Sequence, residues 1–71
     1  MNLFKQKVAC RKEEYKRGDR VMLVKMDDIQ APPVGTQGTV RFVDDIGTVH
    51  VSWDNGSSLG AAMGADIIKR V

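Results

Sequence analysis

The chain has 71 residues, a single cysteine and a formal net charge of +2. A core of this size provides only ~3–5 kcal/mol of net stability, and the lone Cys10 excludes an intrachain disulfide. Hydrophobic residues at 42 % and charged residues at 28 % argue against intrinsic disorder. The apolar stretches fall far short of the ~20 residues that cross a bilayer, and the N-terminus has no hydrophobic signal region. We therefore expect a cytoplasmic domain without a membrane segment.

Residues 1–17 have the pattern of a short amphipathic helix. Phe4, Val8 and Tyr15 recur at helical spacing, Lys and Glu fill most other positions, and Gly18 is placed to end the helix in a left-handed conformation. A helix with so narrow an apolar stripe is not stable alone. We therefore expect it to dock, either on the first strand of its own chain or on a second copy.

The remaining residues, 18–71, have the alternation and turn signals of a small β-rich body. Val40 and Phe42 fall on one face of their segment, and Trp53 is in phase with neighbouring valines, so all three are assigned to the core. A Pro-Pro pair forbids ladder pairing after the first strand and predicts a long loop. The predicted strands are residues 20–26, 38–43, 49–53, 58–60 and 67–71.

The segment Asp54, Asn55 and Gly56 is predicted to be a structural hairpin turn. Asn-Gly favours a type I′ turn, in which both central residues have positive φ. Together with the long loop and the tight hairpins, this order of elements predicts a mainly β fold. We expect a small SH3-like barrel of about five antiparallel strands, preceded by a short N-terminal amphipathic helix.

Several segments resemble the bacterial and phage family known as domain of unknown function 4314. The resemblance implies a prokaryotic cytoplasmic setting, often on mobile elements, and no assigned activity. It is carried by Gly18-Asp19-Arg20-Val21, Met26-Asp27-Asp28, Pro33-Val34-Gly35-Thr36-Gln37-Gly38-Thr39-Val40, Val43-Asp44-Asp45-Ile46-Gly47 and Trp53-Asp54-Asn55-Gly56-Ser57-Ser58-Leu59.

A fainter similarity concerns two families of SH3-like barrels. The pattern Gly35, Gly38 and Val40 is similar to that of KOW modules, and Trp53-Asp54-Asn55-Gly56 is similar to a hairpin of Mib/Herc2 domains. These modules bind RNA or protein. The similarity therefore supports the expected architecture and leaves function open.

We expect no catalytic residue, metal or cofactor, and hence no enzyme. Cys10 and His50 are the one possible nucleophile–base pair, but Cys10 falls on the predicted helix as a partly buried thiol, and no third group is placed to orient the pair. Loop carboxylates are candidate ligands of a divalent cation, although Asp in turns ordinarily accepts bonds from its own backbone. These carboxylates belong to Asp27, Asp28, Asp44, Asp45 and Asp54.

The function favoured by the sequence is a non-catalytic module that binds a protein partner through the loop after the first strand. Long loops on a rigid barrel commonly carry recognition, and exposed strand edges offer self-association as a further route. The residues expected to contact the partner are Asp27, Asp28, Ile29, Gln30 and Val34.

The alternative is nucleic-acid binding by the basic N-terminal segment. Residues 1–20 carry seven Lys or Arg against three acids, whereas residues 21–71 carry four against six. Cations that contact phosphates predict steep salt dependence. A membrane surface is disfavoured as the partner because the apolar stripe is too narrow to insert. The residues of this alternative are Lys5, Arg11, Lys12, Lys16, Arg17 and Arg41.

Overall fold

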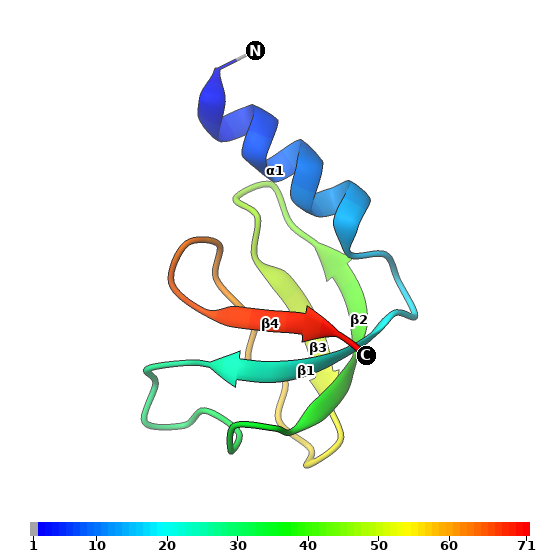
Figure 1. The fold of residues 1–71 in the computed structure, drawn as a ribbon, viewed down its shortest axis with the longest axis vertical. Helices are drawn as coiled ribbons and strands as arrows, with labels where there is room; N and C mark the ends of the chain where they lie inside the picture. The colour runs from blue at the N-terminus through cyan, green and yellow to red at the C-terminus, as the bar shows by residue number, and fades with distance from the viewer. Residues whose placement is uncertain (1) are drawn as a thin grey trace.

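The fold is one N-terminal helix at the end of a four-stranded antiparallel sheet, as Figure 1 shows for the computed structural model, which describes residues 2–71. The sheet has the strand order β3-β2-β1-β4. The prediction of a mainly β fold with a helical lead-in is confirmed. The elements are α1 (Leu3–Glu14), β1 (Arg20–Lys25), β2 (Gln37–Val43), β3 (Val49–Trp53) and β4 (Ile67–Arg70).

One face of the sheet is buried, and its apolar side chains form the core. Trp53 is 3 % exposed, which confirms its assignment to the core, and its indole Nε1 donates to the carbonyl of Leu59 at 2.8 Å. Tyr15 covers one end of this face, and its hydroxyl donates to the carbonyl of Ile68 at 3.3 Å. The core residues are Tyr15, Val21, Leu23, Val40, Val49, Val51, Trp53, Ala61 and Ile68.

The prediction of five strands is wrong, because residues 58–60 do not form one. The carbonyl of Leu59 accepts from Trp53, so this segment follows the indole ring instead of pairing along a strand. Only Ala61 then reaches β3, where its N–H and carbonyl exchange hydrogen bonds with Val49 at 2.8 and 2.9 Å. The result within residues 2–71 is one isolated bridge beside four strands.

The chain reversals before and after β3 have the same three-residue loop, and the predicted type I′ turn at Asn55-Gly56 is wrong. Gly56 has φ +91°, whereas no described residue other than glycine has a positive φ. The N–H of Gly56 donates to the carbonyl of Trp53, and Gly47 makes the same bond to Asp44. This is a type I turn followed by a left-handed glycine, which needs positive φ at one residue only.

Helix α1 projects from the β2–β3 hairpin, and the expectation that it packs on the first strand is wrong. Val8 is its one buried side chain within Leu3–Glu14. The other contacts between the helix and the hairpin are polar. Arg11 Nε donates to the carbonyl of Gly47 at 2.7 Å, and Lys12 Nζ lies 2.8 Å from an Asp45 carboxylate oxygen. The helix therefore docks on a hairpin, through one aliphatic side chain and two cations.

The helix ends at Glu14, four residues before the glycine that was expected to end it. The next residue, Tyr15, has an extended backbone, which sends its ring into the core. Gly18 does have a left-handed conformation, at φ +92°, but within the turn that leads to β1. Among residues 2–71, no helix has the length and apolar content that a membrane span requires.

Candidate functional site

The outer face of β2 and β3 carries an exposed aromatic ring, because β2 contains a bulge. Val40 pairs with Val51 and Phe42 pairs with His50, so Arg41 is an extra residue without a partner in β3. One inserted residue sends the following side chain to the opposite face of the sheet. The assignment of Phe42 to the core is therefore wrong: the ring lies on the outer face and is 49 % exposed.

The Phe42 ring is held in place by His50. The two rings are stacked with centroids 4.3 Å apart and an interplanar angle of 12°. The imidazole Nε2 lies 2.9 Å from the Asp44 carboxylate, whose other oxygen accepts from the N–H groups of Ile46 and Thr48. The hydrogen bond with His50, followed by these backbone bonds, holds the pKa of Asp44 below its usual value.

A groove of about 310 Å³ lies beside this aromatic pair on the outer face. Arg17 and Arg41 both line it, and neither forms an ion pair with any of residues 2–71. Arg17 is brought there because the N–H of Gly18 donates to the carbonyl of Val40 at 2.8 Å. We call this site the outer groove; its lining residues are Arg17, Gly18, Thr39, Val40, Arg41, Phe42 and Ser52.

Of the six cations in the nucleic-acid hypothesis, the structure brings only Arg17 and Arg41 together. Arg11 donates to backbone carbonyls, and Lys12 and Lys16 pair with Asp45 and Glu13, so these three already have partners. Lys5 lines a different hollow on α1, away from Arg17 and Arg41. Among these six cations, the two that share one hollow therefore come from the α1–β1 connection and from β2, and not from the helix.

The neighbouring Arg20 is neutralised on the same face. Its guanidinium forms two hydrogen bonds with the Asp54 carboxylate, at 2.9 and 2.6 Å. This pairing raises the pKa of Arg20 and lowers that of Asp54. The bidentate pair also connects β1 to the turn after β3. Because Arg20 is paired, the unpaired cations at the outer groove are Arg17 and Arg41 among residues 2–71.

The loop predicted to bind protein lies at the far side of the sheet from α1 (Figure 1). Ile29 is fully exposed and Val34 largely so, whereas Pro32 is buried and anchors the loop. Asp28 shapes it, because its side chain and its carbonyl accept from the N–H groups of the next residues, Gln30 and Ala31. Two apolar side chains are thus displayed on an ordered loop.

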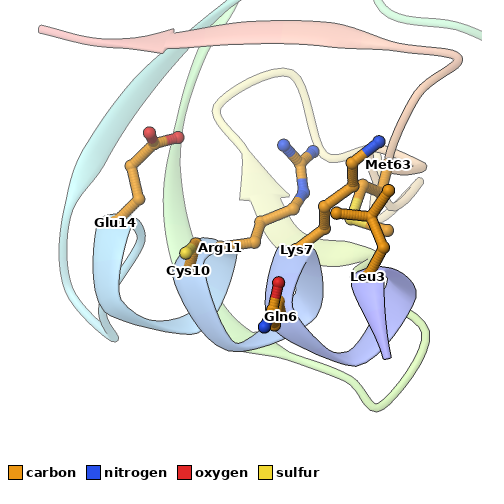
Figure 2. Close-up of a pocket in the computed structure, with 7 residues that line it drawn as sticks. All are labelled: Leu3, Gln6, Lys7, Cys10, Arg11, Glu14 and Met63. Carbon is orange, nitrogen blue, oxygen red and sulfur yellow. The ribbon is translucent and has the colours of Figure 1, made fainter. Parts of the chain in front are cut away.

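A second groove, of about 400 Å³, runs along α1, as Figure 2 shows. Leu3 and Met63 close one end, and Cys10 lies along its length as an exposed thiol, so the expectation of a partly buried cysteine is wrong. Arg11 also lines the groove, but its Nε is bonded to the carbonyl of Gly47. The side chains of Gln6, Lys7 and Glu14 complete the lining, so the groove combines an apolar end with one acid and two cations.

The structure does not bring the candidate catalytic and metal-binding side chains together. His50 has Asp44 as its partner on the sheet, whereas Cys10 faces the helix groove. The loop acids have separate partners: Asp27 lies near Lys25, Asp45 near Lys12 and Asp54 near Arg20. The part of the chain that the structure describes contains no group of three or more His, Cys, Asp or Glu side chains able to hold a metal ion.

The aromatic part of the outer groove escaped the sequence analysis. Alternation predicts that Phe42 lies in the core and that His50 faces solvent, so it predicts no contact between the two rings. The sequence does contain a signal, the basic residue Arg41 directly before the aromatic residue Phe42. Phe42 is followed by Val43, and either of these two apolar side chains could occupy the core. Alternation alone does not reveal this signal, because the bulge decides which of the apolar side chains faces outward.

Comparison with known proteins identifies the family and nothing more specific. No curated protein and no solved structure matches the chain. One family model, described as a domain of unknown function (DUF4314), matches residues 4–71, nearly the whole length. The suspected resemblance is thereby confirmed, and the chain belongs to the DUF4314 family.

Proposed function

We propose that this domain is a non-catalytic module that binds nucleic acid in the outer groove. The observation that carries the proposal is the placement of Arg17 and Arg41, two guanidinium groups without carboxylate partners among residues 2–71, in one hollow of the sheet. Guanidinium groups bind phosphate oxygens well because their planar fork matches the geometry of the anion. The hydroxyls of Thr39 and Ser52 line the same hollow and supply further donors.

Fluorescence anisotropy with a labelled mixed-sequence oligonucleotide, titrated at several salt concentrations, tests this proposal. Each phosphate contact contributes about 0.7 to the salt slope for a single strand, so the variant Arg17→Gln/Arg41→Gln should lower that slope by about 1.4. Lys5→Gln removes one exposed cation outside the groove and is the control. Absence of salt-dependent binding, or an equal effect of the control, would refute the proposal.

A protein partner at the loop after β1 is the second candidate. It is favoured by the exposure of Ile29 and Val34 on a loop that Pro32 and Asp28 already order, because a pre-ordered loop loses little entropy on binding. The expected contacts also include the exposed side chains of Asp27 and Gln30. This candidate requires no positive charge, so its binding should be insensitive to nuclease and only weakly dependent on salt.

A pull-down from cell lysate after nuclease treatment separates the two candidates. Ile29→Ser/Val34→Ser should lose a nuclease-resistant partner, whereas Arg17→Gln/Arg41→Gln should keep it. Ile46→Ser, at an exposed isoleucine of another loop, is the matched control. A partner retained by the loop variant would argue against this site.

We also propose that the sheet is a four-stranded variant of the SH3-like barrel from a bacterial or phage protein that works in the cytoplasm. Support for the architecture comes from the long β1–β2 loop, the two tight hairpins and the bridge between Val49 and Ala61 beside the edge strand β3. An experimental structure in which β4 and residues 58–61 fail to close the sheet would contradict the barrel assignment.

A further inference from the structure

We infer that the outer groove recognises a single-stranded nucleic acid by inserting one unpaired base between the Arg41 guanidinium and the Phe42 ring. The inference rests on the proposed nucleic-acid function and adds the ligand class and the mode of recognition. It depends on a geometry that the charges alone do not explain: a half-exposed aromatic ring sits in the same hollow as the two free cations.

The Phe42 ring has one face that no other ring covers. His50 covers the other face, with ring centroids 4.3 Å apart, and Asp44 fixes the imidazole from behind at 2.9 Å. The ring therefore cannot turn freely, and little conformational entropy is lost when a ligand stacks on it. An exposed aromatic ring on a sheet surface can stack on a base of any type, because every base has a π-face.

Arg41 is placed to cover the other side of an inserted base. Its guanidinium carbon lies over the Phe42 ring, 6.0 Å from the centroid. A planar base in van der Waals contact with both groups needs a separation of about 7 Å, twice the usual carbon–carbon contact distance. Since Arg41 is exposed and without an ion-pair partner among residues 2–71, its side chain can move outward to open this separation and admit the base.

This geometry selects single strands over duplexes. In a duplex the faces of the bases are stacked on one another, and only the edges are accessible in the grooves, so Phe42 has no face to contact. In a single strand a base can leave the stack at low cost and enter the groove. Arg17, which lines the same hollow, then contacts a neighbouring phosphate.

The test compares binding of a labelled single strand of about 12 nucleotides with binding of the same sequence as a duplex. Phe42→Leu keeps an apolar side chain but removes the stacking face, and it should weaken single-strand binding about tenfold, while Phe42→Tyr should bind normally. Phe4→Leu is the matched control, because Phe4 on α1 is also 49 % exposed. We expect Phe4→Leu to change nothing.

A second measurement uses the unaltered protein, so that an unfolded variant cannot leave the inference open. Titration of the single strand should produce ring-current shifts on the NMR signals of Phe42 and the Arg41 side chain. Base insertion would be overturned by equal affinity for duplex and single strand, by an affinity of Phe42→Leu equal to that of the unaltered protein, or by Phe42 signals that do not shift at saturation. Binding that still falls with Arg17→Gln/Arg41→Gln would then leave the proposed function standing, whereas no binding of either ligand would refute both.

Discussion

The change Val8→Ala tests whether α1 is an integral part of the fold or an appendage docked on it. Val8 is buried at 6 % exposure but does not belong to the core cluster of the sheet, whereas Val51 is fully buried within that cluster. Each Val→Ala change removes about 1.6 kcal/mol of burial, at ~0.8 kcal/mol per methylene-sized group. At Val51 a cavity adds to the loss, so we expect about 2–3 kcal/mol in total.

The loss at Val8 has an upper limit that the loss at Val51 lacks. When Val8 is truncated, α1 can detach while the sheet keeps its core, so the global cost cannot exceed the free energy of docking. An isolated helix of 12 residues is marginal in water, and a detached α1 should therefore melt. We expect Val51→Ala to lower the Tm by about 10–20 °C, and Val8→Ala to lower it by less than about 5 °C.

Thermal unfolding followed by circular dichroism gives the Tm, and amide hydrogen exchange gives the local stability of α1. In Val8→Ala the amides of α1 should lose protection while those of β2 and β3 keep it. A fall in Tm equal to that of Val51→Ala, with protection lost evenly over helix and sheet, would refute the reasoning and make α1 part of the cooperative unit.

Three further changes probe the sheet. Gly38→Ala places a Cβ 2.6 Å from a methyl carbon of Val51 and should lower the urea midpoint, with a loss of about 1–3 kcal/mol. Asp44 has a lowered pKa, so it stabilises the fold above the ordinary value of 3.8, and this stabilisation disappears as the pH falls through the folded-state pKa. In Asp44→Asn the Tm should therefore fall less steeply with decreasing pH over that acid range. Trp53→Phe leaves the carbonyl of Leu59 without its 2.8 Å donor and should lower the Tm by about 5–10 °C.

Strand positions were predictable from alternation, but the register within β2 was not. Val40 belongs inside on any assignment, yet Phe42 and Val43 are both apolar, so the pattern is satisfied by either one. The bulge at Arg41 resolves the ambiguity by placing Val43 opposite Val49 and sending Phe42 outward. A single inserted residue leaves almost no mark on composition, although it decides which side chain of β2 faces solvent.

The turns show the same limit at shorter range. Asn55-Gly56 correctly predicted a chain reversal but gave the wrong turn type and a following strand that does not form, because the loop includes Asp54 and needs only the glycine at positive φ. Asn55 instead uses its side-chain oxygen to accept from the N–H of Ser57 at 3.0 Å. Local dipeptide preference identified where the chain reverses, while the number of loop residues was decided by pairing across the strands.

Free charge on a protein surface is a tertiary property, so the number of cations in the sequence of the helix does not show how many of them a ligand can reach. Arg11 and Lys12 lie on a segment rich in cations, but their partners are the carbonyl of Gly47 and the carboxylate of Asp45, both in a hairpin more than thirty residues away. Because these contacts hold the helix on the sheet, Arg11 and Lys12 are less available to bind an external anion. The pair left free in one hollow, Arg17 and Arg41, is joined only by the fold, so a proposal about ligands has to start from which charges folding leaves unpaired.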